Sequence, residues 1–378
     1  MRIAVNARFL LHGQLEGIGT FSNEVLQRVV KQHPEHEFIF FFDRPYHESF
    51  VYAENVTPVV LFPPARHPFL FVWWFEFSVA KAIKKHKADL FFSPDGYLSL
   101  RSKVPQIPVF HDLAFEHYPD DVPFLAAKHY RYFFPRYANR AKKILTVSEY
   151  SKADIQKQYG VVPDKIQVVY NGANEIYQPL NDAKREKVKT KYAQGEEYFL
   201  YVGALHQRKN ITRLLKAYEQ YVIEQKNRNE QPKRLLIVGR KAWGNAEMES
   251  TFTQSDLLQK MVSFTGHLQL EELGNIMASA WYHVNVSYFE GFGIPILESM
   301  KCEVPVITSQ GTSMVEVADD ACIKVDPFNV ESINKGLMQA HGNSELRNGL
   351  IRKAKISSQR FSWEKTANLV SNSMFNYL

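Results

Sequence analysis

Short apolar runs alternate with longer segments of helical period along the whole chain. Runs rich in β-branched and aromatic residues predict six strands in the first half, at 2–6, 37–42, 88–93, 107–110, 143–148 and 166–170. Five more are predicted in the second half, at 198–203, 234–239, 262–266, 282–287 and 304–308. Helical spacing is found at 18–31, 70–87, 124–140, 149–159, 211–226, 271–280, 295–301 and 331–341. Apolar strands separated by helices predict an α/β fold with two doubly wound, Rossmann-like parallel-sheet domains.

The two sets of elements meet at a turn-rich, charged segment near residue 175. Asn171-Gly172 is a turn signal and Pro179 interrupts regular structure. A length of 378 residues also exceeds one ordinary core. We therefore expect domains at 1–175 and 176–360. In two such domains, ligands bind at the carboxyl ends of the strands, which predicts a central cleft with the sheets on either side.

The stretch EGFGIPILE follows a predicted strand and begins a predicted helix. Its two glycines permit a tight turn, and the start of the helix is a favourable place for an anion. Glu298 lies one turn inside the helix, where it is better suited to accept hydrogen bonds from neutral hydroxyls, such as a ribose diol, than to face a phosphate. Glu290 is placed to accept from a second set of hydroxyls. The alternative is a plain strand-to-helix connection with a favourable acid in its first turn.

A second strand end carries the cations that such a site needs. Arg208 and Lys209 precede a predicted helix, for which Asn210 is the expected N-cap. Cations are unfavourable at a helix start, and this conflict disappears if they share a bound diphosphate. Ordinary surface charge is the alternative interpretation.

The first half contributes two further strand ends. Gly17 and Gly19 lie in a glycine-rich loop after the first strand, where the backbone can approach a ligand. His111 follows another strand and is either a ligand contact or a structural histidine.

Composition narrows the class of protein. There are 46 basic and 40 acidic residues, a net charge of +6, and no nucleic-acid-binding signature. Two cysteines, Cys302 and Cys322, argue against a metal cluster or a disulfide framework. The chain begins with an apparent strand, not a signal peptide, and no apolar run approaches the ~20 residues of a membrane span. We expect a cytoplasmic protein, with peripheral contact at the inner membrane face left open.

Taken together, these motifs resemble family 4 of the retaining glycosyltransferases, with the GT-B fold, and in particular bacterial group 1 enzymes of the mannosyltransferase type. The resemblance covers essentially the whole chain, through GIGTF, VFHD, TVSEYSKADI, VVYNG, VGALHQRKNI, FTGHLQLEEL, EGFGIPILESMKCEVPVITS and FSWEKTA. It implies that a C-terminal helix, 361–378, crosses back to the first domain. One departure is Ala204, where family members often carry arginine.

The resemblance implies a role for each matching residue. Glu298 would hold the ribose hydroxyls of a nucleotide-sugar, and Glu290 would contact the donor sugar. Arg208 and Lys209 would neutralise the diphosphate, and His111 would hydrogen-bond the sugar near the anomeric carbon. The other nucleotide contacts would come from Gly17, Gly19, Gly203, Gly266, His267, Gly291, Phe292, Gly293 and Ile294, mostly through backbone atoms.

The implied reaction is transfer of a hexose, with mannose from GDP-mannose favoured, to a hydroxyl of a glycan or a lipid-linked glycan in cell-surface polysaccharide assembly. No DxD metal motif is present, so no metal or other cofactor is expected. Three alternatives stay open: a non-catalytic sugar-nucleotide-binding protein, a sugar phosphorylase of similar fold, and a nicotinamide-dependent oxidoreductase. The last lacks the full GxGxxG fingerprint.

The segment HPFLFVWWFEFSVAKAIKKHK combines aromatic residues with a basic end. It predicts either a helix resting on a membrane beside a lipid-linked acceptor, or a core-packed helix with a solvated basic end.

Overall fold

The computed structural model describes residues 1–65, 67–240 and 246–376, and it divides the chain into two units. The first unit comprises Met1–Gly172 together with the chain from Phe361 onward, and the second is Ala173–Arg360. Residues 377 and 378, the end of the predicted C-terminal helix, lie outside the described residues.

The first unit is built on a seven-stranded sheet in the order β3-β2-β1-β4-β5-β6-β7, with every neighbouring pair parallel. Its strands are β1 (Arg2–Asn6), β2 (Glu37–Phe42), β3 (Val56–Val60), β4 (Leu90–Ser93), β5 (Gln106–Phe110), β6 (Ile144–Thr146) and β7 (Ile166–Val168). Its helices are α1 (Ile18–Gln32), α2 (Pro68–Trp73), the π-helix η2 (Trp74–Val79), α3 (Ala80–Lys85), α4 (Ala114–His117), α5 (Phe124–Arg140), α6 (Glu149–Tyr159) and α16 (Trp363–Phe375). Short 3-10 turns are η1 (Glu48–Phe50), η3 (Pro119–Asp121) and η4 (Pro163–Lys165).

The second unit repeats this design with six parallel strands in the order β10-β9-β8-β11-β12-β13. The strands are β8 (Tyr198–Val202), β9 (Arg234–Val238), β10 (Val262–Gly266), β11 (Tyr282–Asn285), β12 (Val306–Ser309) and β13 (Cys322–Val325). The helices are α7 (Asp182–Ala193), α8 (Ile211–Asn227), α9 (Ala246–Thr253), α10 (Asp256–Met261), α11 (Leu270–Ser279), α12 (Ile294–Lys301), α13 (Ser313–Ala318), α14 (Val330–Gly342) and α15 (Ser344–Ser357). The 3-10 turns are η5 (Gln207–Lys209) and η6 (Ser358–Arg360).

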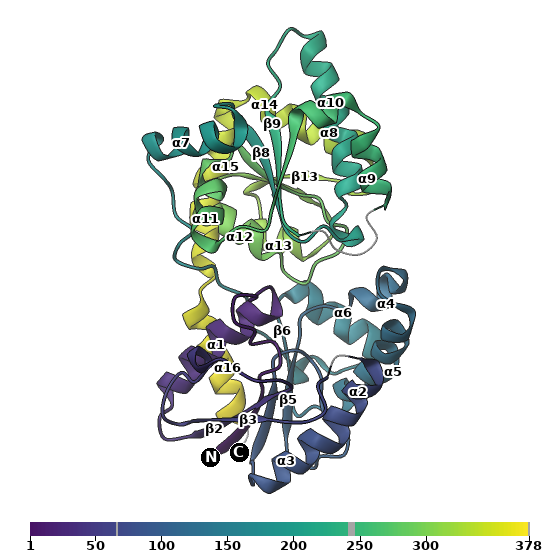
Figure 1. Ribbon diagram of the computed structural model, residues 1–378, viewed down its shortest axis with the longest axis vertical. Helices are drawn as coiled ribbons and strands as arrows, with labels where there is room; N and C mark the ends of the chain where they lie inside the picture. The colour runs from purple at the N-terminus through teal and green to yellow at the C-terminus, as the bar shows by residue number, and fades with distance from the viewer. Residues whose placement is uncertain (66, 241–245, 377–378) are drawn as a thin grey trace. The chain divides into compact units, whose positions relative to one another are not determined.

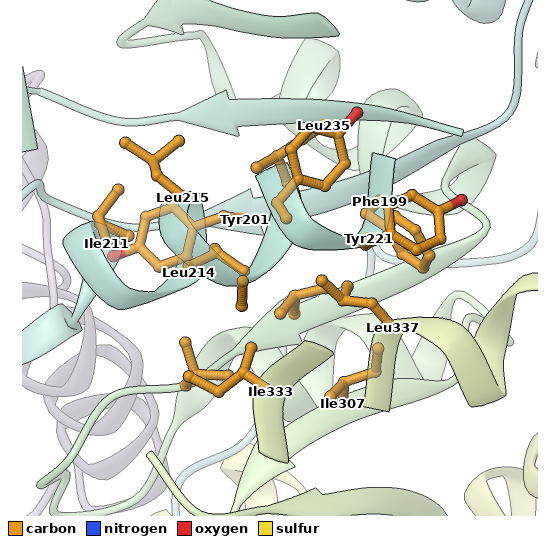
Figure 2. Close-up of a cluster of buried hydrophobic side chains, with 14 of the residues drawn as sticks. Phe199, Tyr201, Ile211, Leu214, Leu215, Tyr221, Leu235, Ile307, Ile333 and Leu337 are labelled. Atoms are coloured by element: carbon orange, nitrogen blue, oxygen red, sulfur yellow. The ribbon is translucent and has the colours of Figure 1, made fainter. Parts of the chain in front are cut away.

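Alternate residues of the central strands enter different cores, which is why these strands are apolar throughout. On β8, Phe199 and Tyr201 belong to a cluster that includes side chains of α8 and α14 (Figure 2). Leu200 and Val202 belong to a separate cluster with α7 and α11. Helices therefore cover both faces of this sheet, as Figure 1 shows for the second unit.

Two strands, β3 and β13, escaped prediction, and each lies at the edge of its sheet. The edge strand β3 contains Pro58 and is only partly buried, so it lacks the apolar continuity of the inner strands. The edge strand β13 alternates buried and exposed residues over just four positions. Pairing on a single side leaves such strands with a weaker sequence pattern.

The C-terminal helix α16 packs on α1 within the first unit (Figure 1). Gly172 allows this return, because a Cβ there would lie 2.4 Å from the backbone nitrogen of Trp363. Gln32 of α1 also donates a hydrogen bond to Glu364, at 2.6 Å.

Cys302 and Cys322 are both unpaired thiols. Of the helices in the described ranges, none combines the length and the apolar character that crossing a bilayer requires.

Candidate functional site

The strand order puts the two most distinctive motifs next to each other. In the second sheet the chain runs outward from β8 through β9 to β10, then returns to place β11 on the other side of β8. The loops after β8 and β11 therefore leave the sheet at the point where the strand order reverses, the usual ligand position in such sheets. The first loop carries Arg208 and Lys209, and the second carries Glu290.

One ion-paired cluster joins Glu290 to Arg208 and Lys209, although more than eighty positions separate the glutamate from the two cations in the sequence. The Lys209 ammonium donates to Glu290 Oε1 at 2.5 Å, and the Arg208 guanidinium donates to Oε2 at 2.9 Å. Arg208 also donates to the carbonyl oxygen of Phe289 at 2.7 Å. The sequence indicated a diphosphate as the partner of the two cations; in the structure a carboxylate lies between them.

The charge of Glu290 depends on those cations. Its side chain is buried, and burial by itself would raise its pKa, but Lys209 and Arg208 outweigh that effect and lower the pKa to about 2. Ser287 adds a hydrogen bond that favours the same ionised form. A buried carboxylate is thus held ionised in the loop after β11 at neutral pH.

The turn after Glu290 leads directly into α12. Gly293 precedes the helix with φ +92°, and a Cβ there would come within 3.2 Å of Ile296 and Met314 side chains, so this position favours glycine. Gly291 and Phe292 are buried, whereas Ile294, the first helical residue, is half-buried. The first turn of α12 has no carbonyl partners within its own helix for its N–H groups, in keeping with the predicted anion position.

Glu298 is half-buried within α12 and differs from Glu290 in charge behaviour. Burial raises its pKa to about 7, while a hydrogen bond from the Tyr177 hydroxyl acts in the opposite direction. Glu298 is therefore only partly ionised at neutral pH. A ligand that donates hydroxyl hydrogen bonds to it would favour its ionised form.

The glycines at the ends of β8, β9 and β10 bring their loops into close contact. A Cβ on Gly203 would lie 2.9 Å from the Tyr201 hydroxyl and 3.9 Å from Cε of Lys209, which places Gly203 beside the ion-paired cluster. A Cβ on Gly239 would overlap the carbonyl oxygen of Gly203, at 1.8 Å. Gly266 has φ +74° and is exposed, as is His267 after it.

The three remaining predicted residues belong to the first unit. Gly17 precedes α1 with φ +43°, and a Cβ on Gly19 would lie 2.8 Å from the carbonyl oxygen of Phe9. His111, at the end of β5, donates from Nε2 to the Pro94 carbonyl oxygen at 2.8 Å. Because a carbonyl only accepts, this bond assigns the proton to Nε2 in the neutral ring. Burial lowers the pKa of His111, so the ring is neutral at pH 7 and presents Nδ1 as an acceptor.

The predicted N-cap role of Asn210 is wrong. Asn210 adopts a left-handed conformation, φ +63°, and its side chain makes no capping bond to α8. The amide instead donates to the carbonyl oxygens of Val286 at 2.9 Å and Pro327 at 2.6 Å. Asn210 thereby holds the loop after β8 against the segments that follow β11 and β13.

Four contributors were not predicted: Tyr177, Gly239, Ser287 and Ser313. Ser313 donates to the Glu290 carbonyl oxygen at 2.5 Å, and Tyr177 and Ser287 bond the two glutamates. Gly239 alone had a usable signal, since it ends a predicted strand with the same Val-Gly pair as Gly203.

Both halves of the chain match models of known families. Residues 15–175 match the model of glycosyltransferase family 4, and residues 182–357 match that of glycosyl transferases group 1. The chain belongs to the family 4 glycosyltransferases.

This glycosyltransferase is similar to curated bacterial relatives over most of its length. It is 29% identical over 294 residues to O-antigen chain mannosyltransferase B of Escherichia coli, covering 78% of this chain and 76% of the relative. It is 28% identical over 262 residues to O-antigen chain mannosyltransferase RfbU of Salmonella typhimurium, covering 69% and 67%.

Solved structures agree on the fold. WaaG, a glycosyltransferase involved in lipopolysaccharide biosynthesis, superposes with a TM-score of 0.76 over 99% of this chain and 100% of its own. Anabaena HepE, solved in complex with UDP and glucose, gives 0.77 over the full length of both chains. Each is 17% identical to the glycosyltransferase, so the likeness establishes the architecture alone: the GT-B fold.

Proposed function

We propose that this glycosyltransferase moves a hexose from a nucleoside-diphosphate sugar to a hydroxyl of a glycan or lipid-linked glycan, with retention of the anomeric configuration. The observation that supports this most directly is the ion-paired cluster of Glu290, Arg208 and Lys209 at the reversal point of the second sheet. The curated relatives are O-antigen mannosyltransferases, which favours mannose as the sugar, GDP-mannose as the donor and cell-surface polysaccharide assembly as the process.

Negative charge develops on the departing diphosphate as the glycosidic bond breaks. Arg208 and Lys209 are placed to stabilise that charge, together with the start of α12. Two fixed cations make a metal unnecessary, so we propose transfer without a metal or other cofactor. Each pre-placed donor of this kind is worth roughly 2.7–4 kcal/mol of transition-state stabilisation.

Each remaining residue has a proposed contact. Glu298 accepts hydrogen bonds from the ribose diol, and Glu290 accepts them from the sugar while orienting both cations. His111 presents Nδ1 to a hydroxyl of the donor sugar. Backbone atoms at the predicted glycine positions, from Gly17 to Gly293, approach the nucleotide.

In the proposed mechanism, the acceptor hydroxyl attacks the anomeric carbon on the face from which the diphosphate leaves. The acceptor's proton passes to a diphosphate oxygen, and the new glycosidic bond keeps the original configuration. This route needs no enzyme nucleophile. Exclusion of water protects the donor from hydrolysis.

The first experiment is a calorimetric screen of UDP-, GDP- and ADP-sugars, followed by turnover with the tightest donor and by NMR of the product's anomeric configuration. Lys209→Ala is expected to reduce turnover by about a hundredfold or more. Lys216→Ala, which removes an exposed lysine paired with Glu247, is the matched control. Near-wild-type turnover of a folded Lys209→Ala enzyme would refute the proposed role of the cluster, and binding without turnover would favour a non-catalytic sugar-nucleotide-binding protein.

A further inference from the structure

The aromatic segment that follows residue 67 forms one continuous helical stretch in the first unit. It runs through α2 (Pro68–Trp73), the π-helical turn η2 (Trp74–Val79) and α3 (Ala80–Lys85). Its inner side is buried in the core of the unit, through Trp74, Phe75, Val79 and Ile83. The core-packed alternative is therefore correct for this side of the helix.

The outer side of the same stretch is strongly aromatic. Phe69, Trp73 and Phe77 recur every four residues and are 71%, 55% and 41% exposed. Trp73 and Phe77 stack with ring centroids 5.0 Å apart. Phe62, 83% exposed, precedes the helix in a loop whose Phe62 carbonyl accepts a hydrogen bond from Ser78 at 2.5 Å. These side chains form an exposed aromatic patch, and folded soluble proteins rarely expose a contiguous apolar surface without a binding partner.

Positive charge continues along this outer side. Lys81, Lys84 and Lys85 are exposed at the C-terminal end of the stretch, and the Arg101 guanidinium lies 4.1 Å from the centroid of the Phe77 ring. The only acidic residue between positions 60 and 87 of the sequence is Glu76, which is buried and accepts hydrogen bonds from two backbone N–H groups at 3.0 Å. Among the described side chains of this stretch, the exposed ones therefore include aromatic rings and cations but no acid.

The neighbouring helix α5 repeats this composition and packs against α2. Phe124 and Tyr132 are exposed, with Lys128 4.3 Å from the first ring centroid and Arg136 3.6 Å from the second. No acidic residue occurs in its sequence, FLAAKHYRYFFPRYANR.

We propose that the outer sides of residues 68–85 and of α5 form a docking face for an anionic lipid bilayer. The inference rests on the proposed function, because it names a surface that holds the enzyme beside a lipid-linked acceptor. Aromatic rings insert favourably at the level of the lipid headgroups, and the lysines at the end of the same face can bind lipid phosphates. The absence of exposed acids on both helix sequences favours an anionic surface over a second copy of this +6 chain, which would bring like charges together.

The test is cosedimentation of the full chain with vesicles of phosphatidylethanolamine and phosphatidylglycerol, with phosphatidylcholine vesicles as the neutral comparison. Wild-type protein is expected to bind the anionic vesicles and to be released by salt. Changing Lys81, Lys84 and Lys85 together to Gln is expected to weaken binding by about fivefold for each lysine, or about a hundredfold in all, at low ionic strength. The double variant Trp73→Ser, Phe77→Ser is expected to lose at least tenfold, even on the anionic vesicles.

Matched variants control for charge and apolar area. Lys184, Lys187 and Lys226 changed together to Gln remove the same charge from exposed positions in the second unit, and Ile223→Ser with Ile356→Ser removes exposed apolar side chains there. Both controls are expected to bind vesicles as the wild type does.

Three results would overturn the docking face. The first is that the wild type does not bind anionic vesicles. The second is that the control variants lose as much vesicle binding as the variants of the docking face. The third is that light scattering shows the wild type to be a dimer, which the double variant Trp73→Ser, Phe77→Ser converts to a monomer. Transfer to a water-soluble acceptor, measured on the same variants, is expected to be unchanged. Vesicle binding without any transfer would contradict the proposed function and support the docking face. Transfer without vesicle binding would support the proposed function and contradict the docking face.

Discussion

Replacing Glu290 by glutamine tests whether the ion-paired cluster is electrostatically coupled as the structure indicates. The carboxylate is 7% exposed and accepts hydrogen bonds from Lys209 and Arg208 at 2.5 and 2.9 Å. Glutamine has nearly the same shape and removes the negative charge. The half-buried side chains of Arg208 and Lys209 then lose the carboxylate that offsets their charge.

The size of the effect follows from the pKa of Glu290. It falls from an ordinary 4.5 to about 2 in the folded protein, a difference of about 2.5, which corresponds to about 3 kcal/mol of stability from ionisation. Because the folded-state pKa is the lower one, this stability is fully present above pH 4.5 and is lost as the pH falls toward 2. At pH 3.5 about 2 kcal/mol of it remains.

The assay is urea unfolding of wild type and Glu290→Gln at about pH 7, 5 and 3.5, followed by circular dichroism. The wild type is expected to be more stable by about 3 kcal/mol at neutral pH, and this gap should narrow by more than about 1 kcal/mol at the lowest pH. Glu303→Gln is the control, since it breaks a surface pair with Lys355 at 3.1 Å and should cost less than about 1 kcal/mol. A gap that is already below 1 kcal/mol at pH 7, or one that stays constant as the pH falls, would refute the reasoning.

Three further substitutions test other parts of the structure. The pKa of Glu298 is raised to about 7, so the carboxylate proposed to bind the ribose is protonated as the pH falls below 7, and the donor KM of the wild type should rise. Glu298→Gln cannot ionise, so its donor KM should be high and independent of pH over that range. Tyr177→Phe removes a hydrogen bond that favours the ionised form of Glu298, so the midpoint of the KM profile should move to higher pH; an unchanged midpoint contradicts the assigned contact. Gly19→Ala should destabilise the protein by about 1–3 kcal/mol in thermal or urea unfolding, because the new Cβ would lie 2.8 Å from the Phe9 carbonyl oxygen. Gly342→Ala is the control: its Cβ would meet nothing within 4 Å, so its effect on stability should be close to zero.

The inner strands of both sheets were predictable because their residues are buried on both faces. Such strands read as continuous apolar runs, and the inner strands β1 and β2 have the predicted bounds. The strand-end motifs were predictable for a related reason, since parallel sheets gather their ligand contacts where apolar runs stop and glycines or charges begin.

The edge strands β3 and β13 were missed because β3 contains Pro58 and is only partly buried, and because β13 has just four residues that alternate in burial. The two sides of the helical stretch 68–85 were equally hard to tell apart. Aromatic residues occupy its whole circumference, so no periodicity distinguishes buried Trp74 from exposed Trp73.

By itself, the sequence determined the α/β class, the central strands and the residue types at the strand ends, because these depend on local periodicity and on which residues lie together in the chain. Only the tertiary structure decided which of those residues interact. Glu290 meets Arg208 and Lys209 across more than eighty positions because β11 lies beside β8, and that contact lowers its pKa to about 2. Glu298, eight residues further on, has a pKa of about 7 because its surroundings provide burial and Tyr177 in place of cations. Two glutamates of one motif thus acquire different charges from long-range packing, which no local pattern encodes.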